Sequence, residues 1–112
     1  MSDLTKGMHR YEVHKFPYVE VRYPDKPTIH ARVEGWNGDM IMIAAPTKLL
    51  DRYSWDQLQI EWVHKDQARR IRSKDSIWAS IEDNTSWHEL EDSRITYRPD
   101  PWLILGQEKR GG

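Results

Sequence analysis

Short stretches of alternating apolar and polar residues run through the first two thirds of this chain, and each predicts a β-strand. The clearest is TIHARVEGW, residues 28–36, in which Ile29, Ala31 and Val33 share one face. This alternation is typical of a strand with one face in the core and one in water. The face expected in water carries His30, Arg32 and Glu34.

A hairpin is predicted directly after this strand, because Asn37-Gly38 separates it from a second apolar run. The Asn-Gly pair favours a type I′ turn, in which both central residues have positive φ. The returning run DMIMIAAP, residues 39–46, is apolar almost throughout. It predicts a central strand covered on both faces and ended by Pro46.

Three further strands complete the predicted sheet. One covers residues 18–23 and ends at the turn sequence PDKP, and another covers WDQLQIEWVH, residues 55–64, with Trp62 expected in the core. Residues 47–54, between the two later strands, are expected to form a connecting loop. The basic sequence ARRIR, residues 68–72, predicts a short and exposed edge strand.

The C-terminal third mixes isolated apolar residues with charges and turn formers. Ser86 and Glu89 have the spacing of a capping box, which predicts a short helix. The sequence of residues 95–97 is compatible with an extra strand, and an apolar cluster follows at residues 102–105. We expect this third to pack on the sheet through its tryptophans Trp78, Trp87 and Trp102.

Composition limits the size of the fold. The chain has 112 residues, of which 38% are hydrophobic and 11% aromatic, so a small core closed by large aromatic side chains is expected. We divide the chain into a polar segment over residues 1–16, a barrel over 17–74, an extension over 75–106 that packs on the barrel, and a disordered tail over 107–112.

The order of elements, with EWVHKDQARRIR at residues 61–72, resembles the SH3-like and Tudor-like small barrels. The nearest resemblance is to uncharacterised small barrels of bacteria and their viruses. It implies a mainly β fold of about five short antiparallel strands, followed by a C-terminal extension with a short helix. It also implies that aromatic residues at loop ends line a ligand face, and these would be Tyr23, Trp36, Tyr53 and Trp55.

The leading hypothesis is therefore a non-catalytic module that binds another protein through these four aromatics, helped by Trp102. For Trp36 and Trp55 a purely structural role, filling the core or a loop, is equally compatible with the sequence. A third hypothesis makes the chain a structural subunit of a larger assembly, such as a virus particle, with residues 102–105 as the anchor.

Nucleic-acid binding is the alternative from another class. The segment KDQARRIRSK is rich in cations that suit phosphate contacts: Lys65, Arg69, Arg70, Arg72 and Lys74. The acidic sequence EDNTSWHELED follows it closely, and the formal net charge of the chain is −1. Two other interpretations are favoured over a free phosphate-binding surface: the acidic stretch folds back on the basic one, or the edge charges only prevent strand addition.

Catalytic and metal-binding motifs are not found in the sequence. The five histidines are scattered without zinc-site spacing, cysteine is absent, and no phosphate-binding loop or nucleophile elbow occurs. We therefore expect no enzyme activity, no metal and no cofactor. The chain also shows no export signal and no membrane-spanning run, so a cytoplasmic location without membrane contact is expected.

Overall fold

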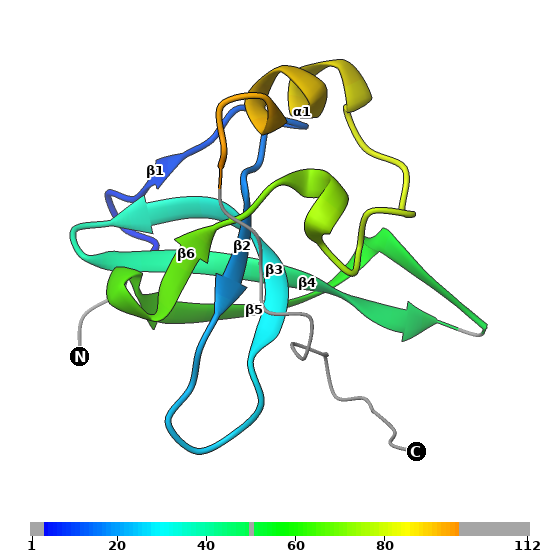
Figure 1. The fold of residues 1–112 in the computed structure, drawn as a ribbon. Helices are drawn as coiled ribbons and strands as arrows, with labels where there is room; N and C mark the ends of the chain where they lie inside the picture. Colours follow the sequence, from blue (N-terminus) through cyan, green and yellow to red (C-terminus); the bar gives the residue numbers. More distant parts are fainter. Residues whose placement is uncertain (1–3, 50, 97–112) are drawn as a thin grey trace.

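The structure is a computed structural model that describes residues 4–49 and 51–96. These residues form one sheet of six antiparallel strands and one short α-helix (Figure 1). The predicted mainly β class with a short helix in the extension is confirmed, while membership of the SH3-like or Tudor-like barrels stays a prediction. The strands are β1 (His9–Arg10), β2 (Tyr18–Val21), β3 (Ile29–Asn37), β4 (Met40–Leu49), β5 (Arg52–His64) and β6 (Ala68–Arg70).

Strands are ordered β5-β4-β3-β2-β6, and β1 pairs separately with β3. The last strand therefore lies beside β2, with Val19 opposite Arg70 and Glu20 opposite Arg69. Two 3₁₀ turns flank β6, namely η1 (Lys65–Gln67) and η2 (Ser73–Asp75), and the chain continues to helix α1 (Thr85–Asp92). β6 therefore lies at the end of the strand order opposite to β5, and the extension follows it.

The hairpin between β3 and β4 forms where it was predicted, but with a different turn. Asn37 pairs with Met40, so Gly38 and Asp39 are the two central residues. Gly38 has a φ of 61°, and positive φ at the first central position is the pattern of a type II′ turn. The predicted type I′ turn is wrong, because only the first central residue has positive φ and Asn37 is the last residue of the strand. The Asn37 side-chain amide donates to the carbonyl oxygens of Leu4 and Lys6.

The connection between β4 and β5 also differs from the prediction. Residues 47–49 and 52–54 are strand rather than loop, and they extend the hairpin into a ribbon that projects beyond the other strands (Figure 1). Pro46 does not end β4, since the pairing of β4 with β3 already stops at Ala44. Pro46 lies beyond Ala44, where β3 no longer pairs with β4. Its missing N–H therefore costs no hydrogen bond to β3.

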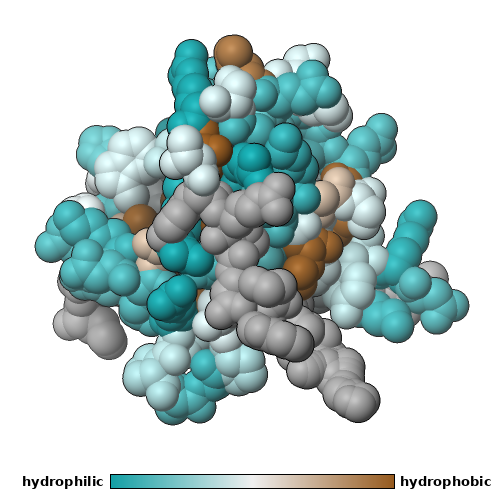
Figure 2. Space-filling model, in the orientation of Figure 1, coloured by the Kyte–Doolittle hydropathy of each residue, from teal (hydrophilic) through white to brown (hydrophobic). Residues whose placement is uncertain are grey.

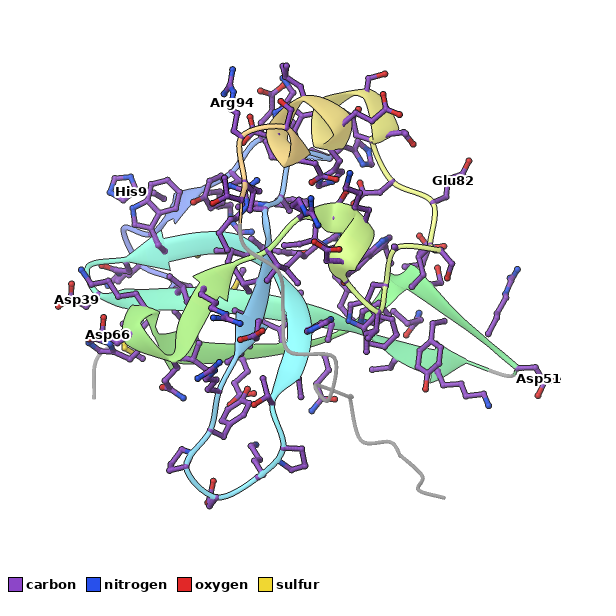
Figure 3. The ribbon with its side chains drawn as sticks, viewed as in Figure 1. His9, Asp39, Asp51, Asp66, Glu82 and Arg94 are labelled. Atoms are coloured by element: carbon purple, nitrogen blue, oxygen red, sulfur yellow. The ribbon has the colours of Figure 1, made fainter. Side chains whose placement is uncertain are left out.

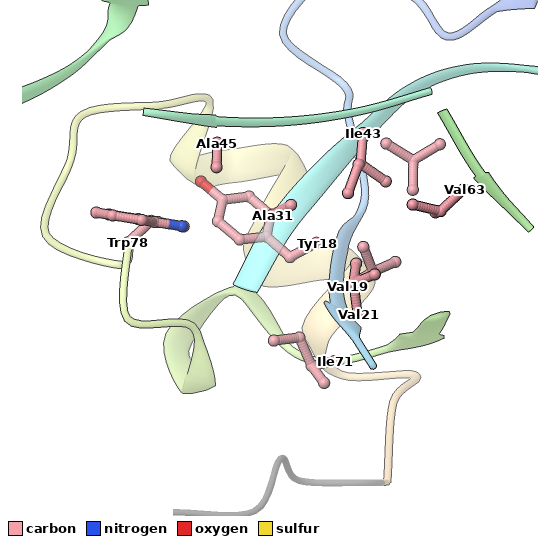
Figure 4. Close-up of a cluster of buried hydrophobic side chains, with 10 residues drawn as sticks. Tyr18, Val19, Val21, Ala31, Ile43, Ala45, Val63, Ile71 and Trp78 are labelled. Carbon is pink, nitrogen blue, oxygen red and sulfur yellow. The ribbon is translucent and has the colours of Figure 1, made fainter. Parts of the chain in front are cut away.

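The hydrophobic core lies on one face of the bent sheet. It contains Val19 and Val21 from β2, Ala31 and Val33 from β3, and Ile43, Ala45, Val63 and Ile71. Figure 4 shows Val63 at one end of this cluster and Trp78 at the other. The expectation that Trp62 lies in the core is wrong: Val63 occupies the core, and Trp62 is half-buried on the opposite face, across from Met42.

The second face of β2 and β3 is buried too, which corrects the expectation that His30, Arg32 and Glu34 face water. Their exposed fractions are 2%, 8% and 8%. The extension covers His30, while Arg32 lies between the rings of Phe16 and Trp55. Arg32 and Glu34 are buried as a pair, in which Arg32 Nη2 donates to Glu34 Oε2 at 2.7 Å. His30 bonds instead to the extension, where its Nδ1 accepts from the N–H of Ile77.

Helix α1 begins two residues earlier than the capping-box pattern predicts. The side chain of Asn84 accepts a hydrogen bond from the N–H of Trp87 at 3.2 Å, so Asn84 is the N-cap and Ser86 lies inside the helix. Asparagine is among the strongest N-cap residues, which explains why it takes this position.

The segment predicted as polar, residues 1–16, contributes a short strand. β1 places His9 opposite Trp36 and Arg10 opposite Gly35 on β3. A Cβ at Gly35 would lie 2.6 Å from the carbonyl oxygen of His9, so only glycine leaves room for this approach.

Candidate functional site

A groove of about 670 Å³ lies between the start of β5 and the segment that follows η2. β5 contributes Tyr53 and Trp55, and the extension contributes Ile77, Trp78 and Ile81. Figure 3 shows this side of the molecule, where the ribbon ends near Asp51 and the extension passes Glu82. Two segments that are distant in sequence thus line the same groove.

The β5 wall owes its shape to an irregularity in the sheet. Leu58 pairs with Pro46 and Ser54 pairs with Thr47, so residues 55–57 of β5 have no partner on β4. Extra residues of this kind bend a strand and redirect its side chains. The bulge lets Trp55 reach back over the sheet, where its ring lies 4.2 Å from the Arg32 guanidinium and 5.8 Å from the Tyr18 ring.

The floor of the groove is fixed by Trp78. Its Nε1–H donates to the carbonyl oxygen of His30 at 2.7 Å, and its exposed fraction is 4%. The Tyr53 ring lies 5.0 Å from the Trp78 ring, tilted by 56°. Tyr53 and Ile77 remain 44% and 41% exposed, so two apolar side chains are presented to solvent on either side of a rigid tryptophan.

His30, on β3, bonds to the segment of the extension that lines the groove. Its Nδ1 accepts a hydrogen bond from the N–H of Ile77 at 2.9 Å, which requires the neutral imidazole. Burial lowers the pKa of His30, although the carboxylates of Glu20 and Asp75 act in the opposite direction. The histidine is thus a neutral acceptor that positions the backbone of the groove.

A second hollow, of about 510 Å³, lies where α1 meets the sheet and includes Tyr18, Asp83 and His88. Asp83 accepts hydrogen bonds from the Tyr18 hydroxyl at 2.8 Å and from His88 Nε2 at 3.1 Å. Burial alone would raise the pKa of Asp83, but the bonds from His88, the Asn84 N–H and Tyr18 lower it to about 2. Burial and the nearby Asp83 raise the pKa of Tyr18.

The polar side chains of this second hollow attach the extension to the sheet. Both Tyr18 and His88 donate to the same carboxylate, so neither is arranged to activate the other as a nucleophile. Ser73, on the same rim, donates its hydroxyl to Asp92 at 2.7 Å. These bonds connect β2, η2 and α1 and hold the extension in place.

The structure brings together two of the aromatic residues predicted to bind a partner, Tyr53 and Trp55, and places the others elsewhere. Tyr23 lies beside a separate hollow, where its hydroxyl donates to Glu61 at 3.0 Å; burial and this carboxylate raise its pKa. Trp36 packs against the rings of His9 and Tyr11 at 5.2 and 4.8 Å. Trp102 lies outside the described residues.

The predicted basic surface is largely paired with carboxylates. Lys65 lies 3.3 Å from Asp39, Arg69 Nε lies 2.6 Å from Glu20, Arg70 lies 3.3 Å from Glu91 and Arg72 Nε lies 2.5 Å from Asp75. Lys74 is exposed, and its backbone N–H bonds to Asp92. The acidic stretch meets the basic one only through Glu91, which pairs with Arg70, and through Asp92, which accepts from the backbone of Ser73 and Lys74. Lys65, Arg69 and Arg72 pair with carboxylates outside that stretch, so the predicted fold-back accounts for only part of the pairing.

Sequence reasoning found the tryptophan that pins the extension, Trp78, but missed Ile77 and Ile81 as groove residues. Their only signal is the spacing of SIWASI, three large apolar side chains within five residues in an otherwise polar segment. This pattern has neither the period of a strand nor that of a longer helix, so periodicity does not assign it to a surface.

Neither a metal-binding cluster nor a membrane-spanning helix is found among the described residues. Residues 4–49 and 51–96 contain no group of three or more histidine or acidic side chains that could hold a metal ion. No helix in that part of the chain is long and apolar enough to cross a membrane. The expectation of a chain without metal or cofactor stays a prediction.

Comparison of the chain with known protein families, with curated proteins and with solved structures finds no match.

Proposed function

We propose that the chain is a non-catalytic interaction module that binds another protein through the groove lined by Tyr53, Trp55, Ile77, Trp78 and Ile81. The observation that carries this proposal is the pair of exposed side chains, Tyr53 and Ile77, on either side of buried Trp78. Energetically important interface residues are aromatic anchors set in rigid, well-packed surroundings. Figure 2 shows hydrophobic side chains as small separate areas within a mostly hydrophilic surface.

A phosphate-binding role for the basic residues has weaker support. Arg69, Arg70 and Arg72 each lie within ion-pair distance of a carboxylate, which reduces the positive potential that attracts a nucleic acid. The absence of cysteine from the sequence fits a reducing compartment, and we propose the cytoplasm.

The test is a pull-down from the native cell lysate with tagged protein, divided into nuclease-treated and untreated halves. We expect one protein to be retained equally in both halves and to be lost with Tyr53→Ala and with Ile77→Ala. Leu90→Ala is the matched control, because Leu90 is 56% exposed on α1, away from the groove.

Two results would overturn the proposal. If both groove variants retain the partner as well as the Leu90→Ala control does, another surface binds it. If nuclease treatment removes everything retained, the basic residues 65–74 are the binding site. Cooperative thermal unfolding of each variant shows that a lost interaction does not reflect a lost fold.

A further inference from the structure

The free edge of β5 is a second surface, separate from the groove. β5 is the longest strand, with 13 residues, and it stands at one end of the strand order. Its pairs with β4 run from His64 opposite Met40 to Arg52 opposite Leu49. In the part of the chain that the structure describes, no strand pairs with its other edge. An unpaired edge of this length is a template for another strand.

Backbone hydrogen bonds show which groups of β5 point to this edge. The N–H of Lys65 donates to the carbonyl oxygen of Asp39, on the β4 side, whereas the N–H of His64 donates to the side chain of Gln67. Backbone groups alternate between the two sides of an antiparallel strand. The N–H groups of Leu58, Ile60 and Trp62 therefore point away from β4, to the free edge.

The two faces of β5 differ in chemistry. Leu58, Ile60 and Trp62 share the face opposite to the core, and Ile60 is 52% exposed. Gln59 and Glu61 point to the core side, across from Ala45 and Ile43. A strand added at this edge would thus meet apolar side chains on one face and polar ones on the other.

Charge on the core side favours a basic partner. Glu61 lines a hollow of about 330 Å³ together with Gln59, Tyr23 and Lys26, whose Nζ lies 4.4 Å from the Tyr23 ring. Glu61 accepts a hydrogen bond from the Tyr23 hydroxyl, and Asp56, which also lines the groove, is exposed in the bulge of the same strand. Neither carboxylate forms an ion pair within residues 4–49 and 51–96, so both remain available to a cation from outside.

We propose that β5 accepts an extended segment of a partner protein as an added strand, with apolar side chains over Leu58, Ile60 and Trp62 and basic side chains toward Glu61. In this mode of recognition the backbone hydrogen bonds supply affinity and the alternate side chains supply specificity. The inference goes beyond the groove and stands whether or not the groove binds a protein.

The experiment uses the full chain and two synthetic ten-residue peptides, one alternating valine with lysine and the other alternating valine with glutamate. Amide hydrogen exchange and chemical shifts, followed by NMR, locate the bound peptide. We expect the valine-lysine peptide to bind about tenfold tighter than the valine-glutamate peptide. It should slow exchange at Leu58, Ile60 and Trp62.

Two variants test the two faces separately. Glu61→Gln keeps an acceptor for the Tyr23 hydroxyl but removes the charge, so the preference for the valine-lysine peptide should disappear. Ile60→Lys places a cation on the apolar face and should weaken binding of that peptide, and Ile60→Thr, which keeps the β-branched side chain, should weaken it less. Ile77→Ala, in the groove, should leave peptide binding unchanged, which separates this proposal from the proposed function.

Several outcomes would overturn the inference. They are equal binding of both peptides, protection that maps to β6 or to the groove, and no protection of β5 by either peptide. Protection of the same amides without peptide, rising with protein concentration, would assign the edge to a second copy of this chain and would also overturn it.

Discussion

Glu20 lies on β2, between β3 and β6, with an exposed fraction of zero. Two arginines neutralise it: Arg69 Nε lies 2.6 Å from one of its oxygens and Arg22 Nη2 lies 3.3 Å from the same oxygen. The Arg22 and Arg69 side chains are 59% and 30% exposed, so either guanidinium is able to turn toward water. Loss of an arginine therefore leaves the buried carboxylate without compensation, whereas loss of the carboxylate leaves arginines that water can solvate.

This asymmetry gives a prediction at the scale of single residues. Arg69→Gln should lower the free energy of unfolding by about 3–5 kcal/mol, because it leaves a buried carboxylate without its nearest cation. Glu20→Gln should cost clearly less, since the two arginines can be solvated. Urea unfolding of both variants at pH 7 measures the difference, and an equal or reversed order would contradict this account.

His30 makes the stability of the protein depend on pH. Its pKa is lowered in the fold, so the unfolded chain binds the proton more readily than the folded one. Stability is therefore fully present above the unfolded pKa of about 6.5 and is lost as the pH falls below it. Protonation would also remove the acceptor for the Ile77 N–H.

We expect urea midpoints of the wild-type protein to fall between pH 7.5 and pH 5.5, and to fall less in His30→Gln. His14→Gln is the matched control, because His14 is exposed and should leave the pH dependence as it is. If the urea midpoints of the wild-type and His30→Gln proteins depend on pH in the same way, protonation of His30 does not affect stability.

At the scale of secondary-structure elements, the sequence predicted strands more reliably than their ends. The alternation around Ile29 to Val33 correctly identified β3, because the side-chain period of a strand is a local property. Pro46 was misread as a strand end because its tolerance depends on where the pairing with β3 stops, which is a tertiary fact. The burial of Arg32 likewise depends on Phe16 and Trp55, which no local pattern connects to it.

The start of α1 provides a test at this scale. Asn84→Ala should lower the free energy of unfolding by about 1 kcal/mol, because the N–H of Trp87 loses its acceptor. Ser86→Ala, at the residue that the capping-box pattern indicated, should be neutral or slightly stabilising, since alanine is the best helix former. Thermal unfolding followed by circular dichroism compares the two, and the opposite order would assign the cap to Ser86.

At the scale of the whole molecule, the extension forms a second layer over the sheet. Its contacts reach β2 through Tyr18 and Asp83, β3 through His30 and Trp78, and β6 through Arg70 and Glu91. Removal of this layer would expose buried polar side chains together with part of the core. The sheet and the extension therefore behave as one folding unit.

A chain ended after residue 74 is expected to lose cooperative unfolding and to bind a hydrophobic dye, because His30 and Tyr18 would lose their cover. The control is a chain ended after residue 96, which keeps these contacts and should unfold cooperatively. Sharp, cooperative thermal unfolding of the shorter chain would show instead that the sheet folds alone.

The same layer explains why only half of the groove could be predicted. Tyr53 and Trp55 were selected because the resemblance to SH3-like and Tudor-like barrels implies that aromatic residues at loop ends line a ligand face. Ile77 faces them only because its N–H bonds to His30, 47 positions earlier in the chain. A partner surface made by two distant segments becomes visible only when their contact is known.

The contacts that cover the sheet also have a consequence for synthesis on the ribosome. Trp78 and His30 are 48 positions apart, and Tyr18 and Asp83 are 65 apart. Translation delivers the N-terminal strands well before the residues that complete them, and closing such distant contacts slows folding. The nascent chain must therefore keep the uncovered face of β2 and β3 from associating with other chains until the extension emerges, which makes chaperone dependence an expected property of its biogenesis.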